Sequence, residues 1–358
     1  MMNRVLPRAL LTVVAAIGIS AVAPASQGQS SAPPSQKIIL PMELIAGQPA
    51  TLAVLDSNGH VAAGVRLVLS NGELVTTDES GRAHFLAPPD GGVMLARIVG
   101  GEIREATDVL PRDADAAGGL QITSLPKLAS LQDRIVVRGS GFQGDADRNR
   151  VSLSGRGVLV LASSPMELIL APLANFAPGA AAITVGQGAG QTSAEVTLVQ
   201  IVSSNSGDQQ IQRGKKNKVR LSAQGTSEPV QLEVRNLTPQ IVQLPHGDET
   251  AVRTSGGSDN SAAVEMKGKS AGAFSFSVSL ENSLSNANVP VARDFLEAAR
   301  KIAPADAAIR IQHMLKNLRD GNADGAAARK ELRKISGSAD SRDFQALLRA
   351  ARRALDGD

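Results

Sequence analysis

The sequence predicts a mainly β protein: three tandem β-sandwiches followed by a small α-helical C-terminal domain. Three observations support this fold class. Between residues 37 and 280, short apolar runs alternate with turn-forming residues. Within several of these runs, apolar and polar residues alternate at every second position. After residue 290, the apolar residues recur at the spacing of a helix. A two-residue period places one face of a strand in a core and the other in water.

Residues 133–142 show the sandwich pattern most clearly. Ile135 to Val137 are β-branched strand formers, Gly139 and Gly141 permit a tight bend, and Phe142 is a large apolar group able to fill the end of a sandwich. We therefore expect the chain to be organised around glycine-punctuated strands of this kind.

Residues 1–25 predict a signal peptide. Arg4 and Arg8 precede an apolar run that ends near Val22, and Ala23-Pro24-Ala25 is a small-residue cleavage pattern. The sequence has no second apolar stretch of the ~20 residues that a membrane helix needs. We expect an exported chain, periplasmic or extracellular, without an integral membrane segment in its mature form. Residues 26–36, rich in Ser, Gln, Pro and Ala, predict a disordered linker.

Composition narrows the function. The chain has no cysteine, which excludes a disulfide, a thiolate metal site and a lipid-anchored cysteine. The net charge of +3 includes the two leader arginines, so nothing indicates nucleic acid as a partner. Charge is nevertheless uneven, with 11 acidic and 6 basic residues in 37–119 and 10 acidic and 14 basic residues in 290–358. Docking of the C-terminal residues 290–358 (the tail) on residues 37–119 (the head) would use this charge difference. We prefer the explanation that these charges lie on faces exposed to water.

Residues 37–111 predict the first sandwich. Hairpin-forming separators such as Asp56-Ser57-Asn58-Gly59 and Ser70-Asn71-Gly72 divide seven short apolar runs. The segment resembles bacterial immunoglobulin-like and carboxypeptidase-regulatory-like (prealbumin-like) modules through Gly64-Val65-x-Leu67 and Thr77-Asp78-x-x-Gly81-Arg82-Ala83-x-Phe85. This resemblance implies an immunoglobulin-like fold and a structural or spacer role.

Residues 120–200 predict the second sandwich. The segment resembles an IPT/TIG domain through Gly139-Ser140-Gly141-Phe142, Asn149-x-Val151, Ser163-Ser164-Pro165 and Pro178-Gly179-Ala180-x-x-Ile183-x-Val185. The resemblance implies an immunoglobulin-like fold with an interaction or spacing role and no chemistry of its own.

Residues 202–285 predict a third sandwich, in which residues 231–235 and 274–278 alternate cleanly between apolar and polar. A basic cluster lies near the start of this segment. Lysines often protect an exposed edge strand from pairing with another chain, so the cluster does not require an anionic partner. The cluster consists of Arg213, Lys215, Lys216, Lys218 and Arg220.

Residues 290–358 predict four short amphipathic helices, which either form a small bundle or lie across the third sandwich.

Two catalytic-type motifs lack the structural setting that they need. Gly139-x-Gly141-x-x-Gly144 matches a dinucleotide fingerprint but is followed by a predicted strand, whereas a phosphate needs a helix N-terminus there. Gly268-x-Ser270-x-Gly272 spells a nucleophile elbow inside a β-rich segment. The four histidines, at positions 60, 84, 246 and 313, have neither metal nor triad spacing. We expect no catalytic residue and no bound cofactor apart from the metal considered next.

One pattern predicts a metal site. Residues 320–331 fit the calcium loop of an EF-hand, with oxygen ligands at loop positions 1, 3, 5 and 12 and Ala326 supplying a backbone carbonyl. The resemblance implies calcium as the ion, although Ala327, Ala328 and Arg319 depart from the family pattern. The alternative is a polar loop between two helices. The candidate ligands are Asp320, Asn322, Asp324, Ala326 and Glu331.

These observations predict a non-enzymatic exported protein that serves as a structural spacer or as a protein-interaction or adhesion scaffold at the cell envelope. Two alternatives are a calcium-binding module that uses residues 320–331 and a carbohydrate-binding accessory protein. We expect an envelope or extracellular protein as the partner. We rank a polysaccharide below it, because the chain has no Trp or Tyr to stack on sugar rings.

Overall fold

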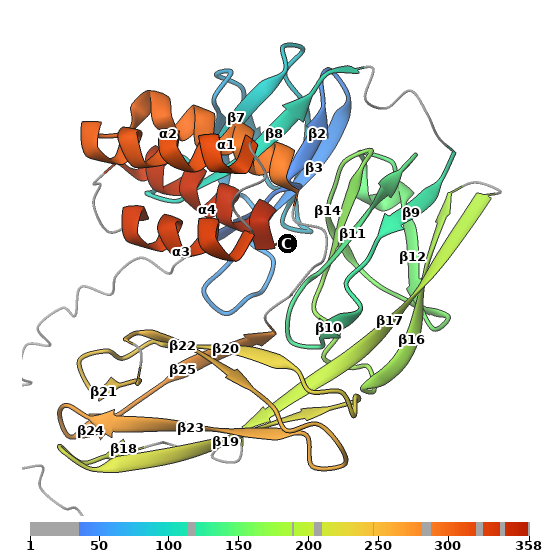
Figure 1. Cartoon of the computed structure of the whole chain (residues 1–358). Coiled ribbons are helices and arrows are strands. Elements are labelled where there is room, and N and C mark those ends of the chain that lie inside the picture. The colour runs from blue at the N-terminus through green and yellow to red at the C-terminus, as the bar shows by residue number, and fades with distance from the viewer. Residues whose placement is uncertain are drawn as a thin grey trace, which may run out of the picture. The chain divides into compact units, whose positions relative to one another are not determined.

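The computed structural model describes residues 36–112, 119–187, 190–203, 210–245, 247–280, 288–319, 325–336 and 341–356. The predicted signal peptide and nearly all of the linker lie outside these residues. Within them the predicted fold class is confirmed: β-strands form successive sandwiches, and four helices follow (Figure 1).

The first sandwich packs two sheets face to face around a core that includes Leu52, Leu67, Phe85 and Met94. One sheet contains β1 (Lys37–Ile39), β3 (Pro49–Leu55) and β6 (Arg82–Leu86). The other has the order β2 (Glu43–Ile45), β8 (Arg104–Leu110), β7 (Gly92–Ile98), β4 (Arg66–Leu69), β5 (Leu74–Thr76). All its strand pairs are antiparallel except β2 with β8.

The second sandwich is built around Val137, Phe142, Leu168 and Ile183, so Phe142 fills the core as its position predicts. One sheet contains β9 (Gln121–Ser124), β11 (Ile135–Ser140), β15 (Glu167–Leu170) and β14 (Val160–Ser163). The other contains β13 (Arg156–Gly157), β12 (Arg150–Leu153), β16 (Gly179–Gln187), β17 (Gly190–Ser203) and β10 (Leu128–Ser130).

The third sandwich encloses Val219, Leu232, Val264 and Phe274. Its larger sheet continues from β17 through β19 (Lys216–Gln224) and β23 (Ser261–Gly268) to β21 (Val242–Gln243). Facing it are β22 (Glu249–Arg253), β20 (Gln231–Asn236) and β25 (Phe276–Leu280), and a short pair is formed by β18 (Gln210–Ile211) and β24 (Gly272–Ala273).

The C-terminal helices are α1 (Val289–Ile302), α2 (Ala305–Arg319), α3 (Gly325–Ser336) and α4 (Arg342–Asp356). They share a core that includes Phe295, Leu315 and Phe344, and this core continues onto the first sandwich through Met42 and Ala106. Helices α1 and α4 thus lie against β7 and β8 (Figure 1). The placement across the third sandwich that the sequence left open is wrong, although Arg352 of α4 forms an ion pair with Glu233 there.

Strand β7 explains why the helices pack on the first sandwich. Met94 and Ala96 lie in the core of the sandwich, while Val93 and Leu95 pack against the helices on the opposite face. A strand that is apolar on both faces is typical of a sheet covered on both sides. The charge difference between head and tail also contributes here, because Arg104 pairs with Asp343 at 3.1 Å and Arg353 pairs with Glu105 at 2.5 Å. Our preference for solvated faces was therefore wrong for these residues.

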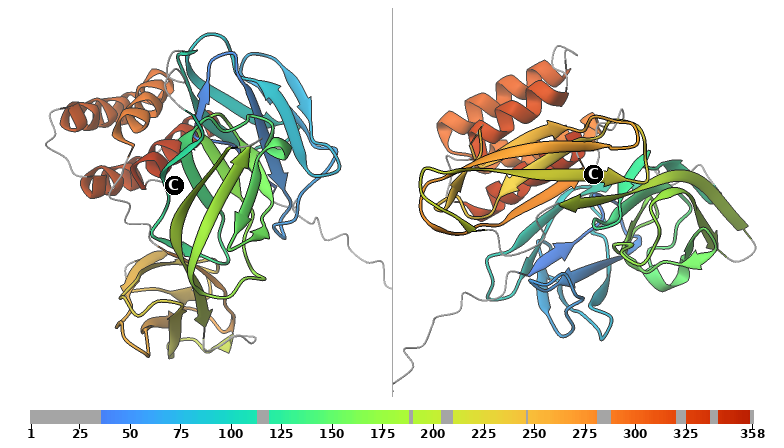
Figure 2. Two further views of the ribbon diagram at one scale, coloured as in Figure 1. Left: turned by 90° about the vertical axis from the view of Figure 1, so that its right-hand side faces the viewer. Right: turned by 90° about the horizontal axis from the view of Figure 1, so that it is seen from below.

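The sandwiches share strands. Strand β3 of the first pairs with β14 of the second at Thr51 and Ser163. Strand β17 pairs with β16 in the second sandwich and with β19 in the third, and Figure 2 shows this continuity from two further directions. Along β17, Leu198 belongs to the second core and the next residue, Val199, to the third. The predicted boundary between residues 200 and 202 thus falls inside one strand.

Among the described residues, no helix combines the length and the apolar character that crossing a membrane requires.

Candidate functional site at the junction of the first two sandwiches

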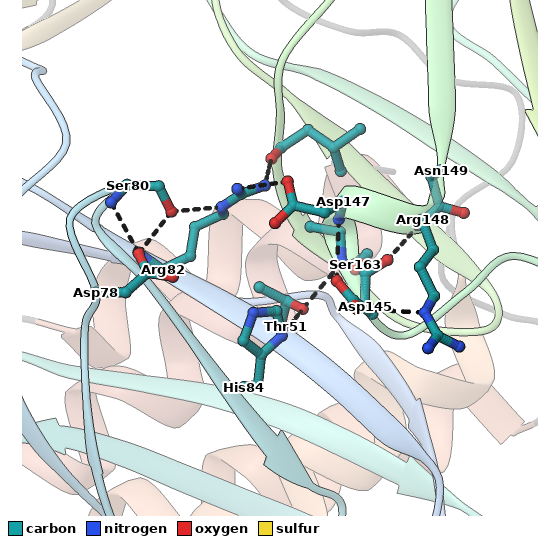
Figure 3. A network of polar contacts seen from close by, with 12 residues as sticks. Thr51, Asp78, Ser80, Arg82, His84, Asp145, Asp147, Arg148, Asn149 and Ser163 are labelled. Carbon is teal, nitrogen blue, oxygen red and sulfur yellow. Dashed lines mark hydrogen bonds and ion pairs between the residues drawn. The ribbon is translucent and has the colours of Figure 1, made fainter.

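Three metal-ligating side chains meet where β6 of the first sandwich approaches the loop after β11 of the second (Figure 3). His84 comes from β6, Asp145 is the N-cap of a short 3-10 helix, Ala146–Arg148, and Asp147 lies within that helix. Their ligand atoms all lie within 4.8 Å of one another. Sequence reasoning missed this group, because His84 and Asp145 are far apart in the chain and a two-residue Asp-x-Asp spacing carries little information on its own.

Thr51 forms hydrogen bonds that connect His84 to the 144–146 segment. Its buried hydroxyl donates to the Gly144 carbonyl at 2.7 Å and accepts from the Ala146 amide at 3.2 Å. His84 Nδ1 lies 3.0 Å from the same hydroxyl. Because threonine has a single hydroxyl hydrogen, already given to Gly144, the imidazole donates from Nδ1, and the neutral ring then carries its lone pair on Nε2. This tautomer is the one that a metal-ligating histidine uses when its other nitrogen is hydrogen-bonded.

Arg82 neutralises one of the two carboxylates. Its Nη2 donates to Asp147 Oδ1 at 2.6 Å, and its Nη1 donates to the Val160 carbonyl at 3.2 Å. The Arg82 side chain is only 7% exposed, whereas that of Asp147 is 66% exposed. Ser80 Oγ, itself bound to Asp78, accepts from Arg82 Nε at 2.8 Å. The guanidinium is thus held from both sandwiches and carries the positive charge that a cation would bring.

Backbone contact at Gly144 closes the junction. A Cβ atom at this position would lie 1.8 Å from the Pro49 carbonyl oxygen, so only glycine permits the two backbone segments to approach this closely. Beside the polar group, apolar residues of both sandwiches form a separate core: Ile39, Ala53, Leu55, Leu161, Ala162 and Ile169. The Gly139-x-Gly141-x-x-Gly144 motif therefore supports close backbone packing, and the helix that follows it has only three residues.

This arrangement can do one of two things chemically. One imidazole nitrogen and two carboxylates can coordinate a divalent cation, but that cation would have to displace Arg82 from Asp147. As the structure stands, Asp145 accepts the amide of Asp147 at 3.0 Å and pairs with Arg148 at 3.5 Å. Each carboxylate therefore has partners within the protein, and the group acts as a polar link between the first two sandwiches.

The predicted calcium loop is only partly described. Asp320, Asn322 and Asp324 lie outside the described residues, while Ala326 and Glu331 lie in α3, which begins at Gly325. The Glu331 carboxylate pairs with Lys334 at 2.9 Å, and the hydrogen bond from Lys334 lowers the pKa of Glu331. Calcium binding by residues 320–331 stays a prediction.

A second polar cluster lies beneath the helices. Asp108 of β8 is 2% exposed, and its Oδ2 atom has no hydrogen-bond partner among the described residues. Burial first, and then the charges of Asp294 and Glu43, raise the pKa of Asp108 to about 7. Burial also raises the pKa of Asp294 on α1 and of Glu43 on β2. Like charges on three neighbouring elements therefore disfavour ionisation of the buried Asp108.

Nearby, Glu167 lies fully inside the protein between the first two sandwiches. Its Oε1 accepts the Met42 amide at 3.1 Å, and its Oε2 lies 3.6 Å from Arg138 Nε. Neither this pair nor the Asp108 cluster follows from sequence spacing, because each depends on how separate strands and helices pack.

An open cleft separates the second sandwich from the third. Its volume is about 1420 Å³, and it is lined by small residues of β16 and by the 225–231 segment. Lys127, Glu195, Glu228 and Arg253 place both signs of charge along it. Gly225 lines the cleft where two backbone segments approach closely, because a Cβ atom at this position would lie 2.3 Å from the Leu198 carbonyl oxygen. Neither the lining nor the charge pattern selects one class of ligand.

Comparisons with known proteins give no family assignment. No protein-family model and no curated protein matches the chain. Among solved structures, a mixed-linkage glucan utilization SGBP-B from Bacteroides ovatus shares 12% identity over 66% of this chain and 73% of that one, with a TM-score of 0.25. A Bacteroides uniformis SGBP-B from a xyloglucan utilization locus shares 10% identity over 69% and 98%, with a TM-score of 0.25. The titin I9–I11 tandem shares 12% over 69% and 98%, with a TM-score of 0.19. Likenesses this weak support no functional argument.

Proposed function

We propose that this protein is a non-enzymatic, exported scaffold that holds interaction surfaces at fixed separations at the cell envelope. The observation that carries the proposal is the sharing of strands between sandwiches, above all β17, which belongs to two sheets without a linker. We also propose that residues 120–200 form an IPT/TIG-type module and that the mature chain begins after residue 25.

The shared strands matter because they remove the usual freedom between modules. Tandem domains joined by a peptide linker reorient readily unless their interface is large and apolar. Here the first junction has its own apolar core together with the Arg82–Asp147 ion pair. The second junction is a continuous antiparallel ladder from Gln200 to Ser203. Bending either junction would break backbone hydrogen bonds or expose apolar surface.

Interaction, rather than chemistry, is the function that this construction supports. Ser270, the serine of the nucleophile-elbow motif, donates its hydroxyl to the Gln240 carbonyl at 2.9 Å in the turn between β23 and β24. It therefore makes a turn hydrogen bond, and no described histidine activates it. The surfaces that partners can reach are the outer sheet faces that the helices leave uncovered and the open cleft.

Spin-label distances test the rigid scaffold directly. The chain has no native cysteine, so Asp90→Cys and Ala271→Cys place one label on an exposed position of the first and one of the third sandwich. We expect a single narrow distance distribution that does not change with salt. A broad or multimodal distribution would show that the sandwiches reorient, and the scaffold proposal would fail.

Cell fractionation tests export separately. Expressed with its leader in a bacterial host, the chain should be recovered outside the cytoplasm, with an N-terminus near Ser26 by mass spectrometry. Recovery of the full-length chain in the cytoplasm would overturn the predicted localisation without affecting the rigidity test.

A further inference from the structure

The outer face of the third sandwich's larger sheet is strongly cationic. Along β19, Val219 and Leu221 point into the core, so the intervening residues Lys216, Lys218 and Arg220 lie on the outer face. Lys267 of β23 lies on the same face, directly opposite Lys216. We call these four residues, Lys216, Lys218, Arg220 and Lys267, the cationic face.

Protection of an exposed edge explains only part of this face. Among the described residues, the segment of β19 that carries Lys216 to Arg220 pairs on one side only, with β23. Lysines on such a segment discourage edge-to-edge pairing. Lys267, however, lies in a strand that pairs with β19 on one side and with β21 on the other. An interior strand has no edge to protect, so Lys267 needs another explanation.

The cross-strand register makes the face costly for the fold. Lys216 and Lys267 are direct cross-strand partners, and like charges directly opposite each other destabilise an antiparallel pair. Glu265 offsets part of this repulsion, since its carboxylate lies 2.6 Å from Lys216 Nζ. Arg220 pairs with Asp259 at the far end of the row. Glu265 is also the direct cross-strand partner of Lys218. Two acidic groups thus face four cations, and among the described residues Lys267 forms no ion pair.

The geometry also restricts the kind of partner. Alternate residues on a strand lie ~7 Å apart and neighbouring strands ~4.8 Å apart, so the cations of β19 form a regularly spaced row with Lys267 beside it. Such a row matches an extended polymer with evenly repeated negative charges. The exposed large apolar residues of the described chain include none from β19 or β23, and binding to a lipid surface uses such residues for insertion. The absence of Trp and Tyr leaves few rings on which nucleic acid bases could stack.

We propose that the cationic face binds a linear anionic polysaccharide, one whose repeating units carry carboxylate or sulfate groups. This inference rests on the proposed scaffold function in one respect: the protein must be exported to the cell envelope to meet such a polymer. Recognition is electrostatic and needs no aromatic stacking, so it is compatible with a chain that has seven Phe and no Trp or Tyr. It also gives a role to Lys267, which lies opposite Lys216 in an interior strand.

Retention on immobilised polygalacturonate and dextran sulfate, with neutral dextran as the blank, tests the proposal. The mature chain should bind both anionic polymers at low salt and elute as salt rises, because the contacts release counterions. We expect Lys218→Gln/Lys267→Gln to lower affinity about ten-fold and to reduce the slope of log K against log salt by about two. Its melting temperature should stay close to that of the wild type, because one substitution removes a like-charge pair and the other an opposite-charge pair; an unchanged value shows that the fold is intact.

Lys301→Gln/Lys316→Gln is the matched control, because it removes the same charge from exposed lysines of α1 and α2. This variant should keep wild-type affinity. Equal losses in the two double variants would indicate a non-specific charge effect and overturn the proposal. So would failure of the wild type to bind either polymer, or tighter binding to phosphatidylglycerol vesicles than to both polymers. None of these results would alter the spin-label distances, so a failed ligand and a failed scaffold remain distinguishable.

Discussion

Replacement of Asp108 by asparagine should stabilise the protein at alkaline pH and leave it nearly unchanged at acid pH. The carboxyl group lies between β8 and α1, is 2% exposed, and has a pKa raised from 3.8 to about 7. Between these two values the folded chain binds a proton that the unfolded chain has released, so stability falls as pH rises through this interval. Above about pH 7 the ionised group is buried without a hydrogen-bond donor on Oδ2.

The magnitude follows from the two pKa values. One pKa unit corresponds to about 1.36 kcal/mol, so the change from 3.8 to about 7 sets an upper limit of about 4 kcal/mol on the destabilisation by Asp108. Separation of α1 from the sheet would let water reach the carboxylate and reduce this cost. We therefore expect Asp108→Asn to gain about 1–3 kcal/mol in unfolding free energy at about pH 8, and less than about 0.5 kcal/mol at about pH 4.

Urea unfolding followed by far-ultraviolet circular dichroism measures this effect, because the helical signal reports α1 to α4. Asp90→Asn, at an exposed loop position of the first sandwich, is the matched control and should follow the wild type at both pH values. The test depends on the difference between variant and wild type, which cancels the contributions of carboxyl groups that do not interact with Asp108; Glu43 and Asp294 titrate together with Asp108, so their coupling to it is part of the measured effect. If Asp108→Asn shows the same pH dependence as the wild type, the buried carboxyl group is not the cause.

Three further predictions concern the junctions and the calcium loop. Gly144→Ala places a methyl group 1.8 Å from the Pro49 carbonyl oxygen and should lower the free energy of unfolding by at least about 2 kcal/mol, measured by heat or urea. The control Gly157→Ala, with open space around it, should be nearly neutral. Arg82→Met removes the hydrogen-bond donors of Asp147 and of the Val160 carbonyl and should lower the free energy of unfolding by about 1–3 kcal/mol. An unchanged unfolding midpoint would contradict this expectation. If residues 320–331 bind calcium, the full chain should melt at a higher temperature with calcium than with chelator, and Glu331→Gln should abolish the difference; identical wild-type curves would remove the calcium hypothesis.

The sequence alone determined the class of fold, because that class follows from local periodicity. Two-residue alternation and turn residues indicated sandwiches, Phe142 was placed in a core, and the 3.6-residue period after 290 indicated helices. Each of these features depends on residues that are neighbours in the chain. Local patterns therefore carried enough information to predict them.

Only the tertiary structure decided what lies next to what. The apolar residues Val93 and Leu95 could have been read as a second covered face of β7, yet nothing in the sequence says that α1 and α4 cover it. Likewise, His84 meets Asp145 and Asp147 because the first two sandwiches pack together, and Lys267 faces Lys216 because strands far apart in the chain pair in one register. Register and docking depend on the summed packing of many distant residues, and no single local pattern encodes them.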